Sequence, residues 1–232
     1  DLKLEIVATG EKAGLWGTIT NTNLQILEQS ASGYQDIDMA GASVTLLLSD
    51  GATSNGKNFY LKLSGTLGGD RTLTMPSGSE RVWIISDETV RGGSNRTLSV
   101  LTASGTSQPV PPGATLLCVS DGTNTTTRII EKGYATITDS NSPYAAVAGA
   151  QIFANTTANP IEIDLPSSPA VGDEITIIDT RGTFASNNLT IDRNGQPINT
   201  GTSNLVLNTN GQSITLVYVD ATRGWAFKTN TA

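Results

Sequence analysis

Carboxylates are the side chains that could carry acid–base chemistry in this sequence, because histidine is absent from its 232 residues. The missing histidine excludes Ser-His-Asp and Cys-His catalytic arrangements and histidine-ligated zinc or iron. Asp36 and Asp38 stand two apart in a β-prone run, so an extended chain places both on one face of a strand. Glycosidases work with paired carboxylates, so cleavage of a polysaccharide is the enzyme activity to weigh for this pair.

Other acids stand where apolar strands end. Asp87 and Asp179 occupy matching positions, as do Asp121 and Asp220, and each enters a turn that contains Gly or Thr. A carboxylate at such a place accepts hydrogen bonds from the backbone of the turn. We favour turn capping for these residues over an exposed Ca²⁺ site or a catalytic role, since no D-x-D-x-D-G loop is present. The sequence therefore predicts no catalytic residues, no metal site and no cofactor.

The acids match because the chain repeats one plan. Gly33-Tyr34 and Gly133-Tyr134 open two segments of similar length. Three matched stretches in them are RTLTMP and IEIDLP (71–76 and 161–166), RVWIISD and EITIID (81–87 and 174–179), and TLLCVSDG and TLVYVDAT (115–122 and 215–222). The repeat predicts an arm at 1–33, a first β-domain at 34–132 and a second at 133–232.

Alternating apolar residues predict the faces of the strands. The expected core positions in the first copy are Leu61, Leu63, Leu73, Met75, Val82, Ile84, Leu98, Val100, Leu116 and Cys118. Those in the second copy are Ile161, Ile163, Leu165, Ile175, Ile177, Leu189, Ile191, Leu216 and Tyr218. This period of two is typical of antiparallel strands with one buried face. We predict an all-β fold of two tandem small antiparallel β-sandwich or jelly-roll-like domains, with a short N-terminal helical arm.

The composition excludes some classes of binding partner. The net charge is −7, and Lys and Arg do not cluster, which argues against nucleic-acid binding. No apolar run of membrane-spanning length occurs, so membrane insertion is not expected. With only 5% aromatic residues, each small domain has a weak core, and we expect oligomerisation to bury more surface. The single cysteine, Cys118, is expected to be a buried thiol.

The arm contains the one credible helix of the sequence. The cluster from Thr20 to Asn23, which includes Asn21, is a candidate N-cap, Leu24 and Leu27 form an apolar face, and Ser32-Gly33 ends the helix. A helix of about eight residues is unstable alone and must dock on another surface. Trp16, between glycines, is expected to fill a pocket rather than to stack on a ligand. We predict Trp16, Thr20, Asn21, Asn23, Leu24 and Leu27 to be the assembly or anchoring residues.

Two further tryptophans are candidate surface contacts. Trp83 interrupts the alternation of its strand, and Trp225 lies on the last strand of the second copy. An outward Trp83 would favour a subunit contact, and Trp83, Trp225 and Tyr144 would be the aromatic platforms for a glycan.

The segment at 2–34 resembles the N-terminal region of bacteriophage fibre-like virion proteins, especially those of marine and cyanobacterial phages. The residues that match the pattern TGE-x-x-G-x-WG-x-x-TN-x-N are Thr9, Gly10, Glu11, Gly14, Trp16, Gly17, Thr20, Asn21 and Asn23. The stretches LSGTLGGDRTLTMP and VPPGAT…CVSDGTN in the first copy, and LPSSPAVGDEITIID in the second, are similar to β-domains of such proteins.

This resemblance implies a virion structural protein, commonly a homotrimer, that is attached by its N-terminal part and displays its C-terminal part. The chain lacks the shaft and receptor head of a long fibre, so a short tail fibre or fibre-like appendage is expected. A capsid decoration or cement protein is the alternative at another site of the virion. A glycan-binding module that recognises the host surface is the alternative from a different class.

Overall fold

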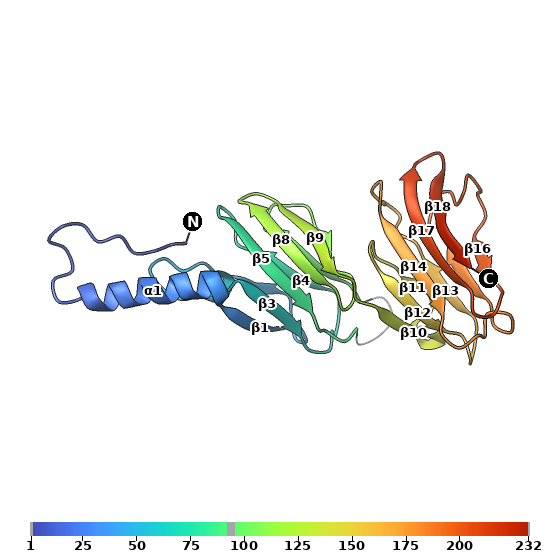
Figure 1. Ribbon diagram of the computed structural model, residues 1–232, viewed down its shortest axis with the longest axis horizontal. Coiled ribbons are helices and arrows are strands. Elements are labelled where there is room, and N and C mark those ends of the chain that lie inside the picture. The colour runs from blue at the N-terminus through green and yellow to red at the C-terminus, as the bar shows by residue number, and fades with distance from the viewer. Residues whose placement is uncertain (1, 92–95, 232) are drawn as a thin grey trace. The chain divides into compact units, whose positions relative to one another are not determined.

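The computed structural model describes residues 2–91 and 96–231, which are mostly β-strand with one N-terminal helix (Figure 1). The chain divides into two compact units. Unit 1 comprises Asp1–Val90, Leu98–Val110 and Thr115–Ile130, and unit 2 comprises Arg91–Thr97, Pro111–Ala114 and Glu131–Ala232. The arm belongs to unit 1.

In unit 1, the described strands form a five-stranded wide sheet and a four-stranded narrow sheet. The wide sheet has the order β1 (Tyr34–Asp38), β3 (Tyr60–Ser64), β5 (Glu80–Asp87), β8 (Thr115–Asp121) and β9 (Thr125–Glu131). The narrow sheet has the order β2 (Val44–Thr45), β4 (Arg71–Met75), β6 (Leu98–Thr102) and β7 (Gln108–Pro109). Successive strands therefore alternate between the two sheets for three coils of the backbone.

Unit 2 repeats this plan in the part of the chain that the structure describes. Its wide sheet has the order β10 (Ala135–Thr138), β12 (Gln151–Asn155), β14 (Glu174–Asp179), β17 (Ser213–Asp220) and β18 (Gly224–Thr231). Its narrow sheet has the order β11 (Tyr144–Ala145), β13 (Ile161–Asp164), β15 (Leu189–Asp192) and β16 (Leu205–Leu207). Short 3₁₀ turns lie at Asn55–Lys57 (η1) in unit 1 and Asp139–Asn141 (η2) in unit 2.

The prediction of two antiparallel β-sandwich or jelly-roll-like domains is wrong, because the equivalent strands of successive coils pair in parallel. In unit 1, β1 pairs with β3, β3 with β5, β2 with β4 and β4 with β6, all in parallel. The fold is a β-solenoid of about six coils in the described chain, three in each unit, and antiparallel pairs such as β5–β8 and β14–β17 follow the coils. Alternation of apolar residues defines the two faces of a strand but not the direction of its neighbour, whereas parallel pairing needs a long crossover. Here that crossover carries the intervening strand of the narrow sheet.

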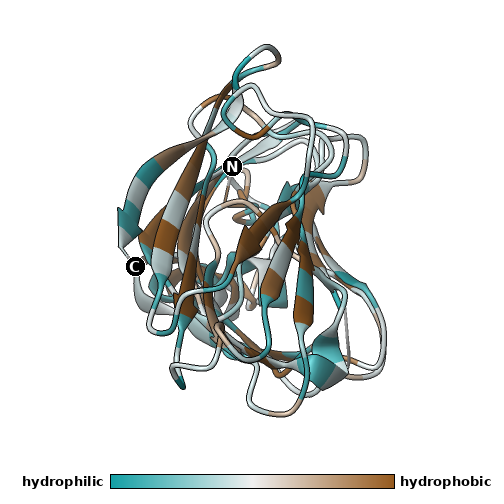
Figure 2. Ribbon diagram, turned by 90° about the vertical axis from the view of Figure 1, so that its right-hand side faces the viewer, coloured by the Kyte–Doolittle hydropathy of each residue, from teal (hydrophilic) through white to brown (hydrophobic). Residues whose placement is uncertain are grey.

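Each unit has a core between its two sheets, and Figure 2 shows apolar and polar segments alternating along the strands. All nine predicted core residues of unit 2 are buried there. In unit 1 the prediction failed on β5, where Trp83 and Ile85 point inward and Val82 is 42% exposed. Four consecutive apolar residues (82–85) allow either face to be buried, and the bulkiest of them takes the interior.

The helix α1 (Trp16–Ser32) is longer than the sequence predicted. Its predicted end is confirmed, because the Gly33 N–H bonds the carbonyl of Gln29. The predicted N-cap cluster instead lies inside the helix, where the Thr22 hydroxyl donates to the Thr18 carbonyl. A side chain that bonds the preceding turn of its own helix does not cap it.

Candidate functional site

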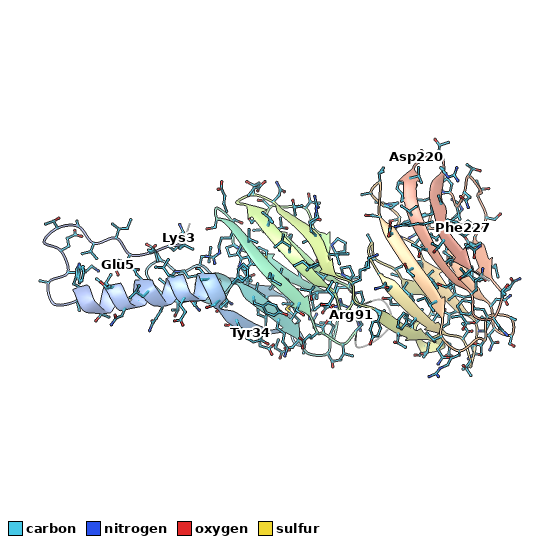
Figure 3. All side chains as sticks on the ribbon, viewed as in Figure 1. Lys3, Glu5, Tyr34, Arg91, Asp220 and Phe227 are labelled. Carbon is cyan, nitrogen blue, oxygen red and sulfur yellow. The ribbon has the colours of Figure 1, made fainter. Side chains whose placement is uncertain are left out.

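The arm consists of α1 and an extended segment at 2–8, which we call the strap. The strap runs back beside α1, and Figure 3 labels Lys3 and Glu5 on it. The predicted anchoring residues all lie on α1. Trp16, Thr20, Leu24 and Leu27 form a stripe along one side of the helix, Asn23 holds the strap, and Asn21 does neither.

The exposed stripe of α1 is formed by Trp16, Thr20, Leu24 and Leu27. At about 100° per residue, these positions fall within an arc of roughly 80°. Trp16 is 66% exposed, Leu24 58% and Leu27 42%, and Thr20 is half-buried. The sequence had suggested that Trp16 fills a pocket. In this chain it does not, because most of its side chain is exposed. The buried side of the helix is marked by Ile19 and Ile26.

Asn23 holds the strap to α1 through its side-chain amide. Its Oδ1 accepts the Glu5 N–H at 3.0 Å, and its Nδ2 donates to the Glu5 carbonyl at 2.9 Å. One amide thus satisfies both backbone groups of one strap residue, as a neighbouring β-strand would. Asn21 is exposed on the helix.

Lys57 supplies a second attachment that sequence reasoning missed. The fully buried side chain donates from Nζ to the Ala52 carbonyl at 2.7 Å and to the Lys3 carbonyl at 3.3 Å. The Gly51 N–H donates to the same Lys3 carbonyl at 2.9 Å. Burial, and then the nearby charge of Arg81, lower the pKa of the Lys57 ammonium. A lone lysine in a polar loop gives no sequence signal for such a role.

An ion pair joins the strap to the loop that leads into α1. Lys12 Nζ lies 2.9 Å from Glu5 Oε1, and this carboxylate raises the pKa of Lys12 through a hydrogen bond and its charge. Both side chains are accessible to solvent, so the pair adds little stability by itself.

The glycine of each Gly-Tyr start has a structural reason. A Cβ at Gly33 would overlap the Gln29 carbonyl and the Asn58 side chain, so the chain leaves α1 where no side chain fits. A Cβ at Gly133 would overlap the backbone of Pro112 and Gly113. The repeated glycine therefore marks close backbone approach at the start of each set of coils.

Removal of the Asn23 amide tests how the strap is held. We expect Asn23→Ala to speed hydrogen exchange of the Glu5 amide by about tenfold or more, because that N–H loses its acceptor. The exposed neighbour gives a matched control, and Asn21→Ala should leave the exchange rate unchanged. Mass-spectrometric exchange on peptides that cover 2–8 measures this, and equal rates in both variants would contradict the attachment.

The predicted surface tryptophans are buried, so they cannot contact a partner. Trp83 is fully buried, its Nε1 donates to the Gly56 carbonyl at 2.9 Å, and Arg81 lies over its ring. Trp225 is also fully buried and packs edge-on against Tyr218. Tyr144 is buried as well. None of these three side chains can serve as a glycan platform.

The acids that end strands cap turns, as the sequence predicted. Asp121 Oδ1 accepts the N–H groups of Thr123 and Asn124, and Asp220 Oδ1 accepts those of Thr222 and Arg223. Asp179 is buried and accepts four backbone N–H groups, from Arg181, Gly182, Phe184 and Gly211. These hydrogen bonds give the acids structural partners in their own turns, and Asp179 is also joined to the turn at Gly211.

The remaining candidates for chemistry are also accounted for. Asp36 and Asp38 share one strand face, where Asp36 pairs with Lys62 at 3.2 Å and Asp38 accepts the Ala40 N–H at 2.8 Å. Cys118 is buried as predicted, and burial raises its pKa to about 12. Among the described residues, no group of three or more His, Cys, Asp or Glu side chains could hold a metal ion. Across 2–91 and 96–231, no helix has the length and apolar character needed to cross a membrane.

No protein family matches this chain, and no curated protein matches it. Among solved structures, one titled "Structure of a chaperone-substrate complex" is similar, with 14% identity and a TM-score of 0.37. The match covers 84% of this chain and 32% of that one, so this chain spans about a third of its length.

Proposed function

We propose that this chain is a structural protein of a bacteriophage virion, a short tail fibre or fibre-like appendage that is attached by its N-terminal arm. The observation that carries the proposal is the apolar stripe of Trp16, Leu24 and Leu27, whose side chains are 66%, 58% and 42% exposed in the described chain. Large apolar side chains that are exposed along one side of a helix are typical of a docking surface. The two solenoid units are then the displayed part.

The sequence motif supports the same proposal. Within TGE-x-x-G-x-WG-x-x-TN-x-N, Trp16 and Thr20 belong to the exposed stripe, and Asn23 holds the strap beside it. The pattern thus combines residues that build the arm with residues that the arm presents. We further propose that the protein acts as a homotrimer, in keeping with its resemblance to fibre-like virion proteins, and that the stripe of each copy docks on other virion proteins.

The number of copies per particle tests the proposal. Quantitative mass spectrometry of purified particles is expected to find on the order of a dozen copies, as a symmetric tail appendage requires. Hundreds of copies would instead indicate a capsid decoration protein, for which the net charge of −7 and the lack of a shaft make this chain suitable. Particles without the protein would contradict both assignments.

A further inference from the structure

The strap has the sequence pattern of a β-strand, but it pairs with no strand of this chain that the structure describes. Residues 2–6, LKLEI, alternate apolar and charged side chains, as a half-buried strand does. None of the sheets described within 2–91 and 96–231 includes the strap. In place of a neighbouring strand, the amide of Asn23 bonds the backbone of Glu5. A strand pattern without a sheet indicates that a partner strand comes from elsewhere.

The strap has one occupied edge and one open edge. Lys3 has a φ of 55°, so the extended part begins at Leu4. In an extended chain, the N–H and C=O groups of successive residues point to opposite edges. Because the backbone of Glu5 points to Asn23, that of Leu4 and Ile6 points away from α1. Within the described residues, no hydrogen bond reaches the N–H or C=O groups of Leu4 and Ile6, which form what we call the open edge.

The side chain of Glu5 turns away from the exposed stripe of α1. It lies against the loop before η1, since a Cβ at Gly51 would lie 3.2 Å from the Glu5 Cβ. The same loop contacts α1, where the Ser54 N–H donates to Gln29 Oε1 at 3.4 Å. At about 100° per residue, Gln29 lies on one side of Asn23 and the exposed stripe lies on the other.

Leu4 and Ile6 therefore face the side of the exposed stripe. Successive side chains of an extended chain point to opposite faces, so both residues turn away from Glu5. Leu4 is half-buried, whereas Ile6 is 92% exposed. A protein that covers the stripe would thus meet the apolar side chains of the strap and its open edge together.

The sheets of the two units show how this chain protects an exposed edge. The edge strand β18 has two shifts of register and carries Lys228, whose side chain is 53% exposed. The edge strand β1 carries the exposed acids Asp36 and Asp38. Irregularities and charges of this kind keep other strands from adding to an edge. The open edge of the strap is instead formed by two apolar residues, which is typical of a site for strand addition.

The single open edge favours a different protein over a second copy of this chain. Asn23 of α1 occupies the other edge of the strap, so each strap can pair on one side. Two straps could then pair with each other, but the third strap of the proposed homotrimer would stay unpaired. A strand from the virion protein that covers the stripe can instead bind every copy in the same way.

We propose that the virion protein on which the arm docks adds a β-strand to the open edge of the strap. The added strand is an extended segment with apolar residues at alternate positions. Its backbone bonds the N–H and C=O groups of Leu4 and Ile6, and its apolar side chains pack beside theirs. This inference rests on the proposed function and states the form of the partner that the arm binds.

Hydrogen exchange on purified particles tests for the added strand. The free full-length protein and the particles are labelled in deuterated water, and fragmentation of the peptide that covers 2–8 resolves single residues. The Leu4 and Ile6 amides should exchange freely in the free protein and slow by about a hundredfold or more in particles. Protection that is already present in the free protein would overturn the proposal, because it would place a copy of this chain at the open edge.

Two other results of this experiment separate the inference from the proposed function. Particles that contain the protein but leave both amides as fast as in the free protein would overturn the added strand alone. Particles without the protein would overturn the proposed function and this inference with it.

Proline substitutions separate backbone pairing from simple burial of the strap. Ile6→Pro removes an N–H from the open edge, whereas the matched control Val7→Pro removes one from the other edge. Ile6→Pro should lower incorporation into particles by about tenfold or more, and Val7→Pro should be incorporated like the wild type. Slow exchange of the Glu5 amide in both purified variants checks that the strap is still attached. Wild-type incorporation of Ile6→Pro, or an equal loss in both variants, would overturn the proposal.

Discussion

Replacement of Leu24 and Leu27 together by glutamine is expected to remove the chain from assembled particles while both units stay folded. Glutamine is a good helix former and fits an exposed position, so α1 should keep its length. The loss of two leucines from a buried contact should weaken docking by about 3 kcal/mol, or roughly a hundredfold. Circular dichroism of the purified variant should match that of the wild type, because neither side chain belongs to the core.

The control for this prediction lies on the same helix. Gln25→Ala with Glu28→Gln alters two exposed positions outside the stripe, and particles should incorporate that variant normally. Immunoblots of purified particles measure incorporation of all three forms. Wild-type levels of the Leu24→Gln, Leu27→Gln chain would contradict an anchoring role for the stripe.

Loss of the Asp179 carboxylate should strongly destabilise unit 2. Four backbone N–H groups converge on this side chain, which is only 7% exposed. Asp179→Ala leaves these donors without their acceptor, and each unpaired buried group costs about 1–3 kcal/mol before water replaces some of the bonds. We expect the free energy of unfolding to fall by about 3–5 kcal/mol. Asp220→Ala, which removes an exposed cap with two donors, should cost about 1 kcal/mol or less.

The pH dependence of unfolding should show how much the charge of Asp179 contributes to stability. Burial acts to raise the pKa of Asp179, but the four backbone donors outweigh it and hold the pKa below its ordinary value. A lowered pKa in the folded state stabilises the fold above the unfolded pKa of about 3.9, and this contribution is lost as the pH falls through the folded value. Urea unfolding at neutral and at acid pH should therefore show the gap between wild type and Asp179→Ala narrowing in acid. A constant gap would contradict the role of the charge.

The sequence allowed the strands and much of the core to be predicted, but not the direction in which neighbouring strands pair. Ile175 and Ile177 on β14 were correctly placed inward, because they alternate with the polar residues Glu174 and Thr176. Residues 82–85 on β5 have no such separation, and the inward position of Trp83 became clear only from its contacts in the fold. The parallel coil was missed, since alternation is the same for both strand directions.

In the arm, too, the sequence predicted the local helix geometry but not the contacts with distant residues. Leu24 and Leu27 were correctly predicted to share a helix face, because their spacing of three residues fixes that geometry. The role of Asn23 was missed, because its partner is the backbone of Glu5, which any residue could supply. The Lys57 ammonium bonds Ala52 in its own loop and Lys3 in the strap, and Lys3 reaches it only when the strap docks.

An electron cryomicroscopy image of the assembled particle would test the central claim most directly, because it would show which part of the chain meets the virion. We predict that Trp16, Leu24 and Leu27 of α1 are covered by other virion proteins, while the solenoid units extend away from the attachment point. A particle in which α1 faces solvent and the chain is attached through unit 2 would contradict it.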